Sequence, residues 1–171
     1  MRKRIQAGVV ALCFACPGLV AAPGGQANRV QVTDLGGKVR IEIRDELFAE
    51  YHYKDVPRPY LYPILGPGGV EMTRSWPMKE VEGEDRDHKH HRSLWWSHGD
   101  INGVDFWSES ATAGKILHDK FLGFKSGSDW GHFREQNKLV ASDGNVIATE
   151  QRVIRVYNSK DDRLLDRKSV V

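Results

Sequence analysis

Short stretches in which apolar and polar residues alternate constrain this fold more than any other feature of the sequence. In residues 39–44, apolar side chains occupy every second position, as expected for a β-strand with one buried face. Turn-forming pairs separate such stretches, among them Asn102 with Gly103 and Asp143 with Gly144. No segment shows the 3.6-residue period of an amphipathic helix. The pattern predicts an all-β protein, an antiparallel β-sandwich.

The turns bound a series of expected strands. These cover residues 39–44, 47–53, 60–65, 92–98, 104–107, 115–121, 131–142 and 145–158. Pro63 cannot donate a ladder hydrogen bond, so its strand is expected to be irregular or to lie at an edge. In the last stretch the alternation breaks near Gln151, which predicts a β-bulge there.

The N-terminal segment has the organisation of a signal peptide. Arg2, Lys3 and Arg4 form a basic start, residues 7–22 are mostly apolar, and small residues lead to a cleavage site after Ala27. The apolar run is too short and too interrupted to predict a membrane span. We expect residues 1–27 to be removed and the mature protein to be exported in a bacterium, to the periplasm or the extracellular space.

The rest of the chain is expected to form one β-sandwich domain over residues 28–165. A total of 171 residues supports one domain at most. The net charge is +2, from 25 basic and 23 acidic residues, so no field is directed at nucleic acid. Both cysteines, Cys13 and Cys16, lie in the segment to be removed, so no disulfide is expected.

The C-terminal hexapeptide from Asp166 to Val171 differs in character from the rest. It reads DRKSVV, which a common sequencing adapter encodes in frame before a stop codon. The preceding residues 163–165 resemble the start of a strand that is cut off. We expect residues 166–171 to be a non-native tail and the β-sandwich to be truncated at its C-terminus.

Residues 82–107 are the expected functional centre, because they hold four of the seven histidines and three of the five tryptophans. If residues 88–92 are extended, His88 and His90 face the same way, about 7 Å apart between Cα atoms. Two imidazoles at that spacing could share one divalent or transition metal ion, with Glu84 or His98 as a further ligand.

A second interpretation of the same stretch needs no metal. His90, His91 and His98, with Glu84, could act as general acids and bases near neutral pH. Arg74 and Arg92 could orient a substrate.

A flat apolar platform for a sugar ring could come from the tryptophans of this stretch. The expected substrate-binding residues are Trp95, Trp96, Trp107 and Asp100. The less specific alternatives are a solvated, charged loop and tryptophans that pack in the core. Trp95 and Trp96 would point to opposite faces of a strand, so at least one is expected in the core. The isolated His52, His118 and His132 are expected to be structural.

Several enzyme classes lack their motifs here. The sequence contains no Gly-x-Ser-x-Gly, no phosphate-binding loop, no Rossmann glycine pattern and no His-Glu-x-x-His. Serine hydrolases, nucleotide-dependent enzymes and zincin proteases are therefore not expected.

Four segments together resemble a family of exported bacterial proteins labelled the PmoA family, or "methane oxygenase PmoA", a domain of unknown function. They are residues 58–63, 66–70, 73–78 and 82–107. The resemblance runs from about Val30 to Leu165. It implies a β-sandwich similar to galactose-mutarotase-like folds, in bacteria that degrade complex glycans. A membrane-bound copper oxygenase is not expected, because no membrane-spanning run follows the signal peptide.

Two hypotheses about function follow. In the first, the protein is an exported enzyme that acts on carbohydrate, with the histidines as acid–base groups or metal ligands. In the second, it is a non-catalytic glycan-binding or accessory module that uses its tryptophans.

Overall fold

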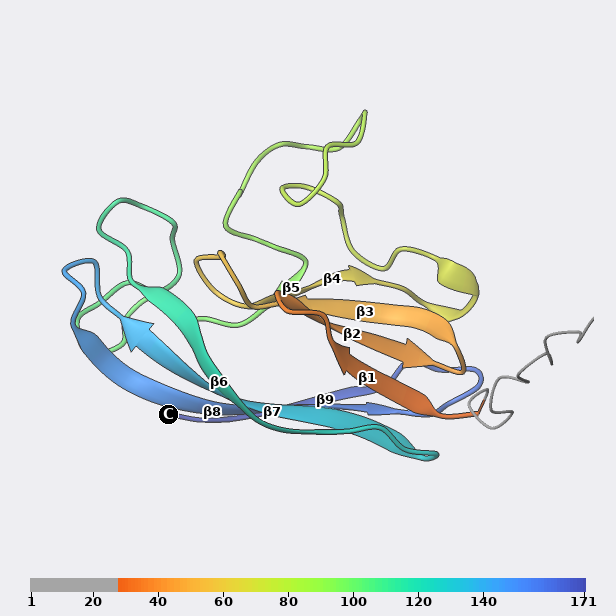
Figure 1. Ribbon diagram of the computed structural model, residues 1–171. Helices are drawn as coiled ribbons and strands as arrows, with labels where there is room; N and C mark the ends of the chain where they lie inside the picture. The colour runs from red at the N-terminus through yellow and green to blue at the C-terminus, as the bar shows by residue number, and fades with distance from the viewer. Residues whose placement is uncertain (1–27) are drawn as a thin grey trace, which may run out of the picture.

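Two antiparallel β-sheets form the protein, which confirms the predicted all-β sandwich. The computed structural model describes residues 28–171, so the predicted signal peptide lies outside the described residues. The first sheet has the strand order β1-β2-β3-β4-β5 and the second β6-β7-β8-β9 (Figure 1). The strands are β1 (Val30–Asp34), β2 (Lys38–Ile43), β3 (Glu46–His52), β4 (Tyr60–Ile64), β5 (Leu94–Trp95), β6 (Lys115–Lys125), β7 (Trp130–Val140), β8 (Val146–Tyr157) and β9 (Leu165–Val170).

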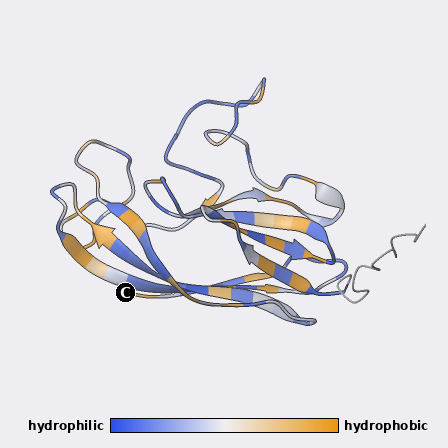
Figure 2. Ribbon diagram, in the orientation of Figure 1, coloured by the Kyte–Doolittle hydropathy of each residue, from blue (hydrophilic) through white to orange (hydrophobic). Residues whose placement is uncertain are grey.

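The core lies between the two sheets and draws side chains from both. Ile41 and Ile43 on β2 contribute from one side, and Phe133 on β7 with Ile154 on β8 from the other. Burial alternates along β2 as the period-two pattern requires, and the strands in Figure 2 show the same alternation of hydropathy. Burial of these apolar faces supplies the main favourable free energy of folding.

Tight turns connect the hairpins at the predicted positions. β2 turns into β3 through Arg44 and Asp45, which have φ angles of 55° and 65°. The turn from β7 to β8 has Gly144 at φ 91°, and its N–H bonds to the carbonyl of Ala141. Left-handed backbone at both turn residues fits the twist of a two-residue hairpin, as at Arg44 and Asp45, and one left-handed residue closes a three-residue turn, as at Gly144.

The expected strand over residues 92–98 is much shorter than predicted. Only Leu94–Trp95 pair as β5, and they bond to Tyr60 and Leu61 at the start of β4. β5 does not extend as far as Pro63 on β4, and on the other side the register with β3 shifts between Ala49 and Tyr51, so no regular ladder pair needs the missing N–H of Pro63. The dense aromatic residues that predicted a strand here instead pack against one another in a loop.

Two further expectations were wrong. Residues 104–107 form no strand, although the turn at Asn102 and Gly103 is present and Ile101 bridges to Val104. The bulge in β8 does not lie near Gln151, which pairs regularly with Gln136. The register shifts instead at the start of the strand, between the pairs of Leu139 and Val140.

Long connections carry the loops that build the site. The chain between β4 and β6 is interrupted only by the short helix η1 (Pro67–Gly69) and by β5, and it projects beyond the first sheet (Figure 1). Across residues 28–171, no helix has the length and apolar character needed to cross a membrane.

Candidate functional site

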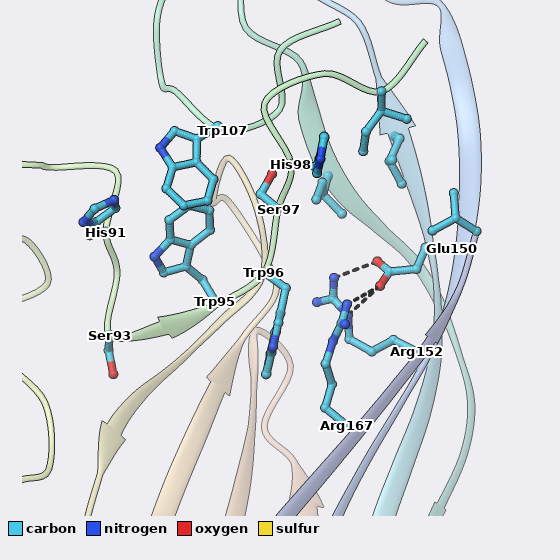
Figure 3. A pocket seen from close by; sticks show the side chains of 14 residues that line it. His91, Ser93, Trp95, Trp96, Ser97, His98, Trp107, Glu150, Arg152 and Arg167 are labelled. Atoms are coloured by element: carbon cyan, nitrogen blue, oxygen red, sulfur yellow. Dashed lines mark hydrogen bonds and ion pairs between the residues drawn. The ribbon is translucent and has the colours of Figure 1, made fainter.

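A hollow of about 540 Å³ opens where the chain around β5 faces the inner side of β8. We call it the tryptophan hollow, defined by Trp95, Trp96, Trp107, Glu150 and Arg152. Figure 3 shows these side chains around it. Its volume falls in the range of roughly 300–1,000 Å³ that is typical of small-molecule sites.

Trp95 and Trp107 form one wall of the hollow. Their ring centroids lie 4.8 Å apart with planes inclined by 59°, and Trp107 is 43% exposed. Arg58 holds the pair from behind: its guanidinium lies 4.9 Å from the Trp95 ring and donates to the carbonyls of Trp107 and Ser108, both at 2.7 Å. The sequence gives no signal for Arg58, a residue between two prolines that is 1% exposed here.

Arg152 and Glu150 form the opposite, charged side of the hollow. Arg152 donates Nε–H to Glu150 Oε1 at 3.1 Å and an Nη2–H to Oε2 at 2.6 Å, a bidentate pair. Burial acts to raise the pKa of Glu150, but the charge of Arg152 and the hydrogen bonds outweigh it, so the pKa is below its ordinary value. Trp96 covers this pair, with the Arg152 guanidinium 5.5 Å from its ring, and also packs against the core.

Arg167 and Val171 also line the hollow, and Arg167 bonds to Glu150 at 2.8 Å. Both residues lie in the segment predicted to be non-native.

The predicted extended histidine segment is a turn. The N–H of His91 bonds to the carbonyl of His88 at 2.8 Å, and His88 has a φ of 37°. The turn nevertheless gathers three imidazoles: His88 stacks on His91 at 5.1 Å, and His90 lies 4.3 Å from His91. We call residues 88–91 the histidine turn. Within residues 28–171, no three His, Cys, Asp or Glu side chains converge to hold a metal ion.

Burial and the neighbouring basic side chains set the pKa of His90 in this turn. Burial lowers the pKa of His90, and the neighbouring His91, His88 and Arg58 lower it further. In Figure 3, His91 lies on the far side of the Trp95–Trp107 pair from Arg152 and Glu150. His91 nevertheless lines the same hollow as these two residues.

Arg74 and Glu84 hold the loop that carries the histidine turn. Arg74 donates to Asp87 Oδ1 at 2.6 Å and to the carbonyls of Asp87 and His88 at 3.2 and 3.3 Å. Glu84 accepts from the backbone N–H of Ser75 and Trp76 at 2.8–3.0 Å, and these bonds hold its pKa below its ordinary value. Both predicted site residues are therefore engaged in shaping the loop.

The other predicted site residues are divided between the hollow and its surroundings. Arg92 makes a bidentate pair with Glu109 through Nε and Nη2, both bonds being 2.9 Å, and does not line the hollow. Asp100 accepts from Gly103 N–H at 2.7 Å and so belongs to the turn. His98 lines the hollow on the Glu150 side in Figure 3, with its Nδ1 in contact with the Asp100 backbone at 2.8 Å.

The structure also contains a buried polar network that the sequence reasoning missed. Tyr51 on β3 bonds to Glu135 on β7 and receives a 2.6 Å bond from Arg152. Asn137 bonds to both Glu135 at 2.9 Å and Glu150 at 3.3 Å. A signal was present: Glu135 and Asn137 occupy inward positions of β7, in phase with its buried apolar residues.

The fold and the hollow together define a class: a two-sheet β-sandwich with an aromatic hollow between the sheets. Residues 38–171 match the family model described as "Family of unknown function (DUF6807)", so the chain belongs to this family. No curated protein and no solved structure matches the chain. The family description names no activity, so the resemblance to the PmoA family, the galactose-mutarotase-like fold and the truncation stay predictions.

Proposed function

We propose that this protein is an exported carbohydrate-binding protein and that its ligand occupies the tryptophan hollow. The observation that carries this function is the arrangement of Trp95 and Trp107 opposite the paired Arg152 and Glu150. Sugar rings present an apolar C–H face and a rim of hydroxyls. An indole accommodates the first, and charged hydrogen-bonding groups accommodate the second.

Binding is favoured over catalysis by the state of the predicted catalytic groups. Arg92 is paired with Glu109, Glu84 accepts backbone hydrogen bonds, and neither residue lines the tryptophan hollow. The histidine turn reaches the hollow through His91, which lies on the far side of the indole pair from Arg152 in Figure 3. Its stacked rings instead support the platform: His91 lies 5.6 Å from both Trp95 and Trp107.

An acid–base enzyme acting on the same sugar is the second candidate, and His98 is the reason. It lines the hollow on the Glu150 side, and backbone contacts to Asp100 fix its Nδ1. An imidazole that is oriented through one nitrogen can exchange a proton through the other.

A glycan array followed by calorimetry with the best-bound glycan tests the binding function. We expect Trp95→Ala and Trp107→Ala each to weaken binding by roughly tenfold, through loss of the stacking surface. Trp130→Ala is the matched control, because Trp130 lies on β7 outside the hollow. Absence of any glycan binding, or equal weakening by the control, would contradict the function.

The variant His98→Gln distinguishes a carbohydrate-binding protein from an acid–base enzyme. For a binding protein, the bound glycan is recovered unchanged and His98→Gln has no effect on it. If the glycan is converted, and His98→Gln stops conversion while binding persists, the protein is an enzyme instead.

A further inference from the structure

A second cavity, of about 630 Å³, lies between the chain that leaves β3 and the start of β6. It shares no lining residue with the tryptophan hollow. The residues that line it are Tyr53, Lys54, Asp55, Val56, Pro57, Lys115, Leu117 and His118. The backbone joins its two sides, since Ile116 N–H bonds to the carbonyl of Pro57 at 2.9 Å.

His118 is held in this cavity in one orientation. Its Nδ1 lies 2.9 Å from Glu135 Oε2, and its ring packs between Tyr53 at 4.6 Å and Phe121 at 4.2 Å. Because a carboxylate oxygen accepts at Nδ1, the proton resides there and Nε2 is the free nitrogen. Among residues 28–171, no side chain or backbone group hydrogen-bonds to Nε2, and the imidazole is 13% exposed.

The partners of Glu135 fix this geometry. Glu135 is fully buried, and its Oε1 receives bonds from Tyr51 and from Asn137 at 2.9 Å, with Arg152 3.6 Å away. Its other oxygen, Oε2, is therefore committed to His118. A buried carboxylate thus orients the imidazole that lines this cavity, an arrangement also found behind histidines at functional sites.

The charges around the cavity favour an anion. Lys54 and Lys115 are exposed and form no ion pair with any residue of 28–171. Asp55 is the acid that lines the cavity, so two lysines face one carboxylate. The titratable groups around His118 are these three together with Tyr53 and Glu135.

We infer that this cavity is a binding site for a small anion, a carboxylate or a phosphate, which accepts a hydrogen bond from His118 Nε2–H and is attracted by Lys54 and Lys115. An imidazole that donates to Glu135 on one side and to the ligand on the other carries both protons. This site does not depend on carbohydrate binding in the tryptophan hollow.

NMR of the histidine imidazole signals tests the site, with the His118 signal assigned from His118→Gln. The probes are glucuronate, inorganic phosphate and glucose, the last being a neutral match for glucuronate. We expect glucuronate or phosphate to shift the His118 signal in a saturable way and glucose to leave it unchanged. The anion that shifts it identifies the source as a carboxylate or a phosphate. An equal shift with glucose, or no shift with either anion, would overturn the site.

Surface variants keep the test independent of folding. We expect the double variant Lys54→Gln/Lys115→Gln to weaken anion binding roughly tenfold. Lys79→Gln/Lys120→Gln is the matched control, because both lysines are exposed and lie outside the cavity. Calorimetry measures the affinity of each variant for the anion. Unchanged affinity in the first variant, or equal weakening in the control, would contradict the role of these residues.

Discussion

The histidine turn and His118 represent two opposite histidine environments in one small protein. The turn gathers His88, His90 and His91 in an exposed loop, where they contact mainly one another and the Trp95–Trp107 pair. His118 stands alone in the sequence but is bonded to a fully buried glutamate between the sheets. The clustering of histidines along the sequence therefore did not identify His118, the histidine that pairs with a fully buried carboxylate.

The difference arises from how each group is held. Loop residues 74–87 shape the turn through exposed hydrogen bonds such as that of Arg74 to Asp87, and such bonds contribute little to global stability. His118 instead belongs to a network in which each buried charge depends on the others. We expect changes in the network to affect the free energy of unfolding and changes in the turn to remain local.

The largest effect is expected for Arg152→Met. This change leaves Glu135 and Glu150 buried without their main cation, and it should lower the free energy of unfolding by about 3–5 kcal/mol. Urea unfolding followed by tryptophan fluorescence measures it. The control is Arg134→Met on the exposed face of β7, expected to change stability by less than about 0.5 kcal/mol. Similar midpoints for the two variants would contradict the network's role.

The matched pair His118→Gln and His90→Gln compares the two environments directly. We expect His118→Gln to cost about 1–3 kcal/mol, because Glu135 loses a hydrogen-bond partner in the core. His90→Gln should change the unfolding free energy by less than about 0.5 kcal/mol. Both are measured by the same urea titration. If the His90 change costs as much as the His118 change, the turn is not a local structure.

Acid should open the loop at Glu84 before the sandwich unfolds. The pKa of this carboxyl is held below its ordinary value of 4.5 by the N–H groups of Ser75 and Trp76. A depressed pKa means that the stabilisation is complete above pH 4.5 and is lost as the pH falls through the lower, folded-state value. NMR of the two amides should follow this loss.

Glu84→Gln should give the acid-shifted amide positions already at neutral pH. Glu82→Gln, two residues earlier and exposed, should leave both amides in place. Retention of the native amide positions in Glu84→Gln would show that the carboxylate does not anchor the loop.

The smallest effect is expected for the titration of His90. Its pKa lies below the ordinary value of 6.5 because of burial and of the neighbouring His91, His88 and Arg58. The folded turn therefore binds fewer protons than the unfolded chain, so its stability declines as the pH falls from 6.5 through the lower pKa. In His91→Gln, NMR titration should show the pKa of His90 moving up toward 6.5. His132→Gln, on β7, serves as the control and should leave it unchanged.

Much of the fold could be predicted because it depends on local patterns. The alternation in residues 39–44 and the turn at Asp143 and Gly144 act over a few residues, and both appear where expected. The aromatic residues after Arg92 led to the prediction of a strand longer than the one observed, because tryptophans favour strands and also pack well in loops. At the site, the residue types predicted that Trp95 and Trp107 lie near the histidines. They did not predict which charged side chains already form hydrogen bonds with other residues of the protein.

The sequence by itself determined that the chain forms strands, where most of them turn, and that histidines and tryptophans gather between residues 88 and 107. Only the tertiary structure decided the partners of the charged groups. Glu135 lies 17 residues from His118 and 84 from Tyr51, yet one carboxylate contacts both. Period-two patterns show which face a side chain occupies. Sheet order and register decide which side chains meet across the core, because these depend on packing of the whole chain.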